Sequence, residues 1–127
     1  MFRDPQVNIY VADVEASLRF YDLLGFTETF RTPERGAPVH VELRLGEFIL
    51  GLADIAAARD MHGVEVGPTG LPRAEVVLWT DDVDTAVAGL SAHGVPVLSK
   101  PHDFVEMLRA AWVADPDGNP VQLVTRR

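Results

Sequence analysis

The chain has 127 residues, of which 47% are hydrophobic and 24% are charged, the proportions of an ordinary globular domain with one core. It contains no cysteine, which excludes disulfides, thiolate metal sites and a cysteine nucleophile. The formal net charge of −8 argues against a nucleic-acid or anionic-membrane partner, because phosphate groups attract Lys and Arg. No apolar run is long enough to cross a bilayer, and the N-terminus lacks the layout of a signal peptide, so we expect a cytoplasmic protein.

The first predicted strand and helix recur in the second half of the chain. Residues 7–26 read VNIYVADVEASLRFYDLLGF and residues 76–95 read VVLWTDDVDTAVAGLSAHGV, with matching positions a constant distance apart. In both segments an apolar strand leads to an Asp that can cap a helix, and a Gly ends the helix. Apolar residues at helical spacing predict that each helix buries one face.

Strands are expected after each helix. Residues 39–45 (VHVELRL) alternate between apolar and polar, and residues 48–52 return as their hairpin partner after a tight turn. In the second half, residues 108–114 and 121–125 are predicted strands, joined by the turn DPDGN at residues 115–119. Each half therefore reads as a strand, a helix and about three strands.

This order predicts an α+β fold in a single domain, residues 1–127, built from two βαβββ modules. Module one spans about residues 5–58 and module two about residues 74–127. The segment between them, about residues 59–73, is rich in Gly and Pro and is read as a linker, with a short helical turn expected at residues 56–59.

The helices decide which way the side chains of each strand point. Each helix needs an apolar surface to pack on, and alternate residues from Val7 and from Val76 can supply it, together with Leu50 and Leu52 and the matching Val121 and Leu123. The residues between these positions then face away from the helices. We therefore expect a curved eight-stranded sheet with the helices on its convex side and a cleft on its concave side.

The candidate ligand-binding residues are the aromatic and polar side chains of this concave face. Aromatic rings supply stacking area, and polar groups orient a small molecule through hydrogen bonds. The candidates are Asn8, Tyr10, Phe30, His40, Glu42, Gly51, Glu75, Trp79, Phe104, Met107, Trp112 and Gln122. Burial in the core or a dimer interface is the alternative for the tryptophans, and His40 with Glu42 could hold a metal instead of touching a ligand. Phe20 and Tyr21, on the first helix, are expected in the core.

The first strand and helix, with the spacing Ser17…Phe20-Tyr21…Leu24-Gly25-Phe26, and the closing DPDGNPVQLV at residues 115–124 resemble the vicinal oxygen chelate superfamily. This superfamily contains glyoxalase I, extradiol dioxygenases, fosfomycin-resistance transferases and drug-binding proteins of the bleomycin-resistance type. The resemblance covers nearly the whole chain. It implies paired βαβββ modules around a cleft and a side-by-side homodimer.

The resemblance also implies four cleft positions at which the enzymatic members hold a divalent metal. These positions correspond to Gln6 and Glu75 in the first strand of each module and to Gly51 and Gln122 in the last strand. One carboxylate, two amides and a glycine are a poor donor set, because a catalytic metal ion prefers His nitrogen or carboxylate oxygen from at least three residues. We therefore expect no metal, no other cofactor and no catalytic residue.

The cleft and the resemblance together predict a non-catalytic protein of the bleomycin-resistance type, which confers resistance by sequestering an aromatic or cationic antibiotic. The alternative is a metal-dependent glyoxalase-like lyase or isomerase, or a dioxygenase, with an atypical ligand set. A third reading is metal-free acid–base chemistry by Glu75 or His40.

Overall fold

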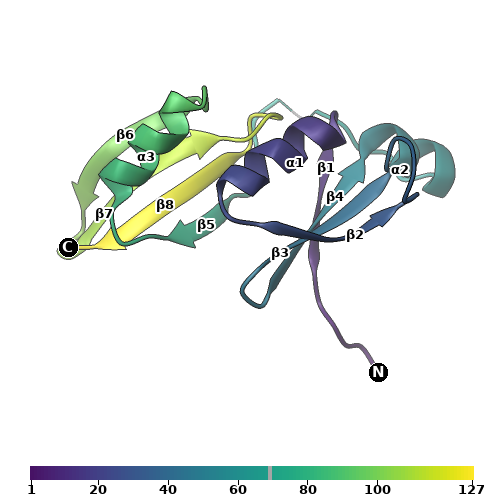
Figure 1. Ribbon diagram of the computed structural model, residues 1–127, viewed down its shortest axis with the longest axis horizontal. Helices are drawn as coiled ribbons and strands as arrows, with labels where there is room; N and C mark the ends of the chain where they lie inside the picture. Colours follow the sequence, from purple (N-terminus) through teal and green to yellow (C-terminus); the bar gives the residue numbers. More distant parts are fainter. Residues whose placement is uncertain (69) are drawn as a thin grey trace. The chain divides into compact units, whose positions relative to one another are not determined.

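The structure is a computed structural model that describes residues 1–68 and 70–127. The chain divides into two compact units, Met1–Pro68 and Thr69–Arg127, which we call module one and module two. Each module contains its own four-stranded sheet (Figure 1). The predicted α+β fold with a repeated βαβββ order is confirmed. The eight predicted strands divide into two sheets, one in each module.

Module one holds the first copy of the repeat and one further helix. Its elements are β1 (Val7–Val11), α1 (Val14–Leu23), β2 (Thr27–Thr32), β3 (His40–Leu45), β4 (Phe48–Asp54) and α2 (Ile55–His62). The strand order is β1-β4-β3-β2, with β1 parallel to β4 and the other pairs antiparallel. Asp13 caps α1 as predicted, because its side chain accepts a hydrogen bond from the backbone N–H of Ala16 at 3.0 Å.

Module two repeats this arrangement. Its elements are β5 (Val76–Trp79), α3 (Val83–Ala92), β6 (Val97–Phe104), β7 (Leu108–Ala114) and β8 (Pro120–Arg126). The strand order is β5-β8-β7-β6, again with one parallel pair, β5 and β8. Asp82 caps α3 by accepting from the N–H of Thr85 at 3.1 Å. β7 coincides with the strand expected at residues 108–114.

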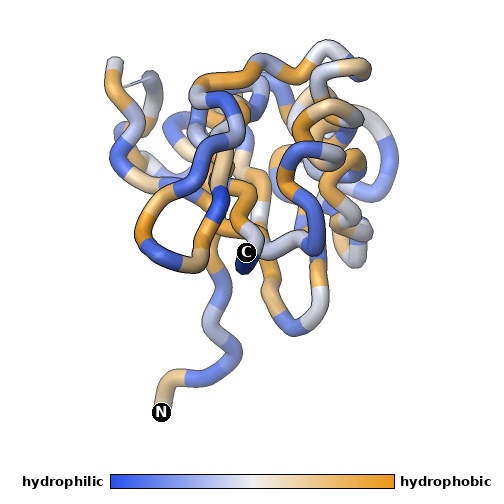
Figure 2. The backbone as a smooth tube through the Cα atoms, turned by 90° about the vertical axis from the view of Figure 1, so that its left-hand side faces the viewer, coloured by the Kyte–Doolittle hydropathy of each residue, from blue (hydrophilic) through white to orange (hydrophobic). Residues whose placement is uncertain are grey.

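The core of each module lies between its sheet and its helix. Leu50 and Leu52 of β4 are fully buried, and so is Val121 of β8, as the predicted packing surface requires. Phe20 and Tyr21 are buried, with their rings edge to face at 4.8 Å, so their predicted core position is confirmed. Hydrophobic and hydrophilic stretches alternate along the chain in Figure 2, as expected for elements with one buried face.

The first strands of the modules pack less deeply than predicted. Val11 is fully buried, but Val7 is 53% exposed and Ile9 is only half-buried. The reason is that β1 lies at the edge of its sheet and α1 contacts β4, the neighbouring strand. In module two, α3 contacts β6, β7 and β8, and edge strand β5 leaves Val76 half-buried.

The segment expected as a linker begins with an ordered helix. Instead of a short turn at residues 56–59, α2 runs over Ile55–His62. The Asp54 side chain caps it by accepting from the N–H of Ala57 at 2.9 Å, and Gly63 ends it in the left-handed conformation with φ 66°. Among residues 1–68 and 70–127, no helix has the length and apolar character needed to span a membrane.

Candidate ligand-binding site

The sheet face of module one that points away from α1 collects most of the predicted residues of that half. Asn8, Gly51, Glu42 and Phe30 pair across all four strands and form one row. Residues that pair directly across a sheet point to the same side. Tyr10 lies in the next row, in register with Ala53, His40 and Thr32. The structure therefore brings the six predicted residues of module one onto one face.

The polar groups of this face already contact one another. His40 Nε2 lies 3.0 Å from Glu42 Oε2, as their shared strand face suggested. The Gln6 side-chain amide donates a hydrogen bond to Asn8 Oδ1 at 2.9 Å. The Phe30 ring, half exposed, lies with its centroid 6.4 Å from the His40 ring. The face thus combines an exposed aromatic ring with an imidazole–carboxylate pair.

Gly51 is buried beneath two of these side chains. A Cβ atom at this position would collide with the carboxamide oxygen of Asn8 and would lie 3.0 Å from His40 Cε1. The space that a side chain at position 51 would need is therefore filled by its neighbours.

Module two presents a corresponding face on the side away from α3. Val77, Gln122, Trp112 and Ser99 form one row across its four strands. The next row contains Trp79 on β5 and His102 on β6. This face therefore carries both tryptophans of the chain.

Trp112 is held between an acid and a histidine. Its indole N–H donates a hydrogen bond to Glu75 Oε2 at 2.8 Å, and the His102 ring stacks on it with centroids 5.9 Å apart and an interplanar angle of 19°. His102 Nδ1 lies 2.7 Å from the Lys100 carbonyl oxygen. Because a carbonyl only accepts, Nδ1 is the donor in this contact.

His102 belongs to this site, although it is not among the residues expected there from the sequence. Pro101 interrupts the apolar pattern there, and β6 tolerates it as an edge strand with register shifts on either side of Ser99. The overlooked signal is the two-residue spacing of His102 and Phe104, whose rings lie 6.4 Å apart on the same strand.

Met107, another candidate residue of this half, lies outside the strands. It occupies the turn between β6 and β7 and is 59% exposed. The alternation of a strand does not extend into a turn, so the sheet does not dictate where this side chain points.

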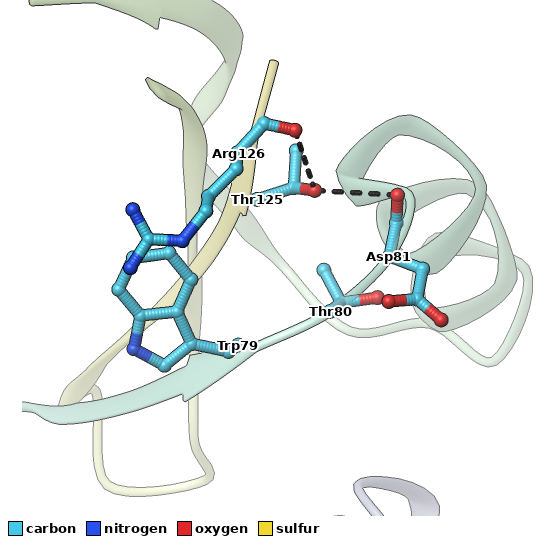
Figure 3. A pocket seen from close by; sticks show the side chains of 5 residues that line it. All are labelled: Trp79, Thr80, Asp81, Thr125 and Arg126. Carbon is cyan, nitrogen blue, oxygen red and sulfur yellow. Dashed lines mark hydrogen bonds between the residues drawn. The ribbon is translucent and has the colours of Figure 1, made fainter. Parts of the chain in front are cut away.

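Trp79 lies beside a hollow in module two. The hollow has a volume of about 340 Å³ and is lined by Trp79, Thr80, Asp81, Thr125 and Arg126 (Figure 3). The Arg126 guanidinium carbon is 5.0 Å from the centroid of the Trp79 ring. The Thr125 hydroxyl donates to the backbone carbonyl of Asp81 at 3.2 Å. Of these residues only Trp79 was expected from the sequence, because contacts between two strands leave no local pattern.

The strongest ion pairs of module two lie on its other face. Arg109 Nε and Nη2 donate to the Asp84 carboxylate of α3 at 2.7 and 2.8 Å, and Arg109 Nη1 donates to Asp103 at 2.9 Å. Hydrogen bonds from Arg109 hold the pKa of Asp84 below its usual range, and those of both carboxylates raise the pKa of Arg109. These pairs join the helix to the sheet and take no part in the candidate site.

The residues at the metal-binding positions of the vicinal oxygen chelate enzymes do not fit a divalent ion. Gly51 supplies no donor, and Gln6 already donates to Asn8. One Glu75 oxygen accepts from Trp112, and the amide of Gln122 carries no charge. In the part of the chain that the structure describes, no group of three or more His, Asp or Glu side chains could hold a metal ion.

The comparisons with known proteins agree with this architecture. The family model described as Glyoxalase/Bleomycin resistance protein/Dioxygenase superfamily matches residues 5–123. The chain therefore belongs to this superfamily, as its repeat and closing motif indicated. A search of curated proteins found no match.

Solved structures share the fold at low sequence identity. A glyoxalase/bleomycin resistance protein/dioxygenase family enzyme from Burkholderia phytofirmans PsJN is similar at 23% identity and a TM-score of 0.81, over 96% of this chain and 97% of that chain. TioX from Micromonospora sp. ML1 is 20% identical, with a TM-score of 0.78 over 98% and 100%. Lactoylglutathione lyase from Agrobacterium tumefaciens is 21% identical, with a TM-score of 0.69 over 96% and 92%. At these identities the likeness concerns the fold alone.

Proposed function

We propose that this protein binds an aromatic small molecule on the sheet faces that point away from α1 and α3 and releases it unchanged. In this proposal the ligand is an antibiotic, and resistance follows from sequestration. The protein acts as a homodimer in the cytoplasm. Membership of a superfamily that includes bleomycin-resistance proteins supports this choice over an unrelated function.

The observation that carries the proposal is the donor set at the four family positions. A divalent ion that polarises a substrate needs charged or imidazole ligands and an open coordination position. Gln6, Gly51 and Gln122 supply no charge, and the remaining carboxylate, Glu75, is engaged by the Trp112 N–H. Binding without metal-assisted conversion is the function that these residues support best.

The aromatic side chains of the two faces support a planar ligand. Phe30 is 50% exposed and Trp79 is 58% exposed, whereas Tyr21 on the helix side of its sheet is buried. An exposed aromatic ring offers area on which a planar ligand can stack. Holding such a ring in place loses less conformational entropy than holding a flexible aliphatic side chain. Glu42 pairs with Phe30 across the sheet and Glu75 accepts from the Trp112 indole, so both carboxylates add negative charge beside aromatic rings, which favours a ligand that carries a cationic group.

The test is a calorimetric titration of the purified protein with a panel of planar and cationic antibiotics, followed by recovery of each ligand. We expect saturable binding of at least one compound, recovered chemically unchanged. Phe30→Leu should weaken that binding about fivefold or more. Phe48→Leu is the matched control, because Phe48 is 38% exposed but its ring packs against Phe26.

The metal-dependent alternative is tested on the same preparation. Elemental analysis and titration with Mn²⁺, Fe²⁺, Ni²⁺ and Zn²⁺ should give no stoichiometric complex, because the donors are too few. A tightly held ion together with a product formed from any panel compound would replace the binding function with an enzymatic one.

A further inference from the structure

The hollow beside Trp79 carries an arginine, Arg126. Arg126 makes no ion pair with any carboxylate within residues 1–68 and 70–127, although its neighbour Arg127 contacts Asp103 at 3.1 Å. The group that Arg126 does contact is the indole of Trp79, at 5.0 Å. A guanidinium that lies over an aromatic ring keeps its N–H groups available for hydrogen bonds with another partner.

The other lining groups do not compete for that edge. The Thr125 hydroxyl is engaged with the Asp81 backbone carbonyl at 3.2 Å, and Thr80 Oγ1 accepts from the N–H of Asp82 at 3.4 Å. Figure 3 shows the guanidinium over the indole at one end of the hollow and the Asp81 carboxylate at the other. The end next to Trp79 is therefore cationic and aromatic, and the far end is acidic.

The size and charge of the site restrict its ligand. A volume of about 340 Å³ is at the small end of the usual range for small-molecule pockets. One arginine can pair with a single anionic group. The net charge of −8 on the whole protein repels a polyanion such as RNA or DNA. The guanidinium fork matches the two oxygens of a carboxylate.

We propose that this hollow binds an aromatic carboxylic acid, whose carboxylate pairs with Arg126 and whose ring packs against the part of the Trp79 indole that the guanidinium leaves exposed. This site goes beyond the proposed function, since it takes an anionic ligand at the Trp79 end of the hollow, whereas Glu42 and Glu75 favour a ligand with a cationic group. It adds Arg126 as the residue that selects an anion. Asp81 lies at the opposite end of the hollow. Its carboxylate favours a ligand whose hydrogen-bond donors are on the side of the ring far from the ligand's own carboxylate.

The experiment compares two probes of nearly the same shape, 2-naphthoate and the neutral 2-naphthamide. Their binding is followed by NMR through the indole N–H of Trp79, assigned with Trp79→Phe, and the Nε–H of Arg126. We expect naphthoate to shift both signals saturably and to bind about five- to tenfold tighter than naphthamide. Arg126→Gln should abolish this preference, and Arg126→Lys should keep part of it, because the charge remains while the fork is lost.

Arg127→Gln is the matched control, since it removes the neighbouring positive charge, which is paired with Asp103. It should leave the preference for naphthoate intact. Three results would overturn the assignment of an anion site. They are equal affinity for the two probes, no shift of the Trp79 and Arg126 signals, and an equal loss of the preference for naphthoate in Arg126→Gln and Arg127→Gln. None of these results bears on the antibiotic panel, so the failure of this inference is separable from the failure of the proposed function.

Discussion

The Trp112 indole of β7 and the Glu75 carboxylate, one residue before β5, are joined by a hydrogen bond of 2.8 Å. β8 lies between β5 and β7 in the sheet, so this bond reaches over an intervening strand. It orients one of the two indole rings of the face and occupies an oxygen of the one carboxylate at the family's metal positions. The same contact therefore favours a stacking surface and disfavours a metal site.

The contribution of this bond to stability can be isolated with a double-mutant cycle. Trp112→Phe removes the N–H, and Glu75→Gln replaces the charged acceptor with a neutral one. We expect a coupling of about 0.5–1 kcal/mol in the free energy of unfolding, because the bond is partly open to solvent. Urea denaturation of the two single variants and the double variant measures it. Strict additivity would mean that the bond contributes nothing in solution.

The turn before β8 depends on Asp115, which is buried. Its Oδ1 accepts from the N–H groups of Asp117 at 3.0 Å and Asn119 at 2.8 Å, and its Oδ2 accepts from the Asn119 side chain at 3.1 Å. Asp115→Ala leaves these donors without their acceptor and should lower the free energy of unfolding by about 2–3 kcal/mol. Asp115→Asn keeps one acceptor oxygen and should lower the free energy of unfolding by less. A thermal or urea melt distinguishes them, and the affinity for a ligand should stay unchanged in the folded protein.

Two glycines should respond in opposite directions to replacement by alanine. At Gly51 the new Cβ collides with the Asn8 carboxamide, which must rotate away and give up its bond from Gln6. The loss should be about 1 kcal/mol, with shifted NMR signals from Asn8 and His40. At Gly89 of α3 a Cβ meets nothing within 4 Å, and Gly89→Ala should stabilise by about 0.5–1 kcal/mol. Equal unfolding midpoints for the two variants would contradict the packing described around Gly51.

The pair of Asp84 and Arg109 should shape the response to acid. Hydrogen bonds from Arg109 hold the pKa of Asp84 below its usual range, so the unfolded chain takes up this proton at a higher pH than the folded one. The stabilisation is therefore complete above the unfolded pKa and disappears as the pH falls through the folded one. Arg109→Gln should flatten the loss of stability below about pH 4, measured as urea midpoints between about pH 2 and 6. The control is Arg44→Gln, because Glu47, the partner of Arg44, is nearly fully exposed. This variant should lose stability below about pH 4 as the original protein does.

The local patterns of the sequence predicted the elements well where each pattern lay within one element. Asp13 and Asp82 cap helices because a carboxylate at that position can accept from the N–H three residues later, whatever the rest of the chain does. Alternation correctly separated the buried Leu50 and Leu52 from Gly51 on the opposite face of β4. The bounds of β6 were not predicted, since Pro101 masks an edge strand. α2 is longer than the turn expected at residues 56–59, since a helix of eight residues has little periodicity to detect.

The amino-acid order by itself determined the two βαβββ modules, their caps and turns and the side of each strand that faces its helix, because these depend on neighbours a few residues away. Only the tertiary structure decided that His102 stacks on Trp112 and that Arg126 covers Trp79. Those contacts join residues on different strands, and their geometry depends on register shifts and edge positions, which alternation does not encode. The depth of burial was decided in the same way, as Val7 shows: an apolar residue on the correct side of a strand is covered only where a helix reaches over it.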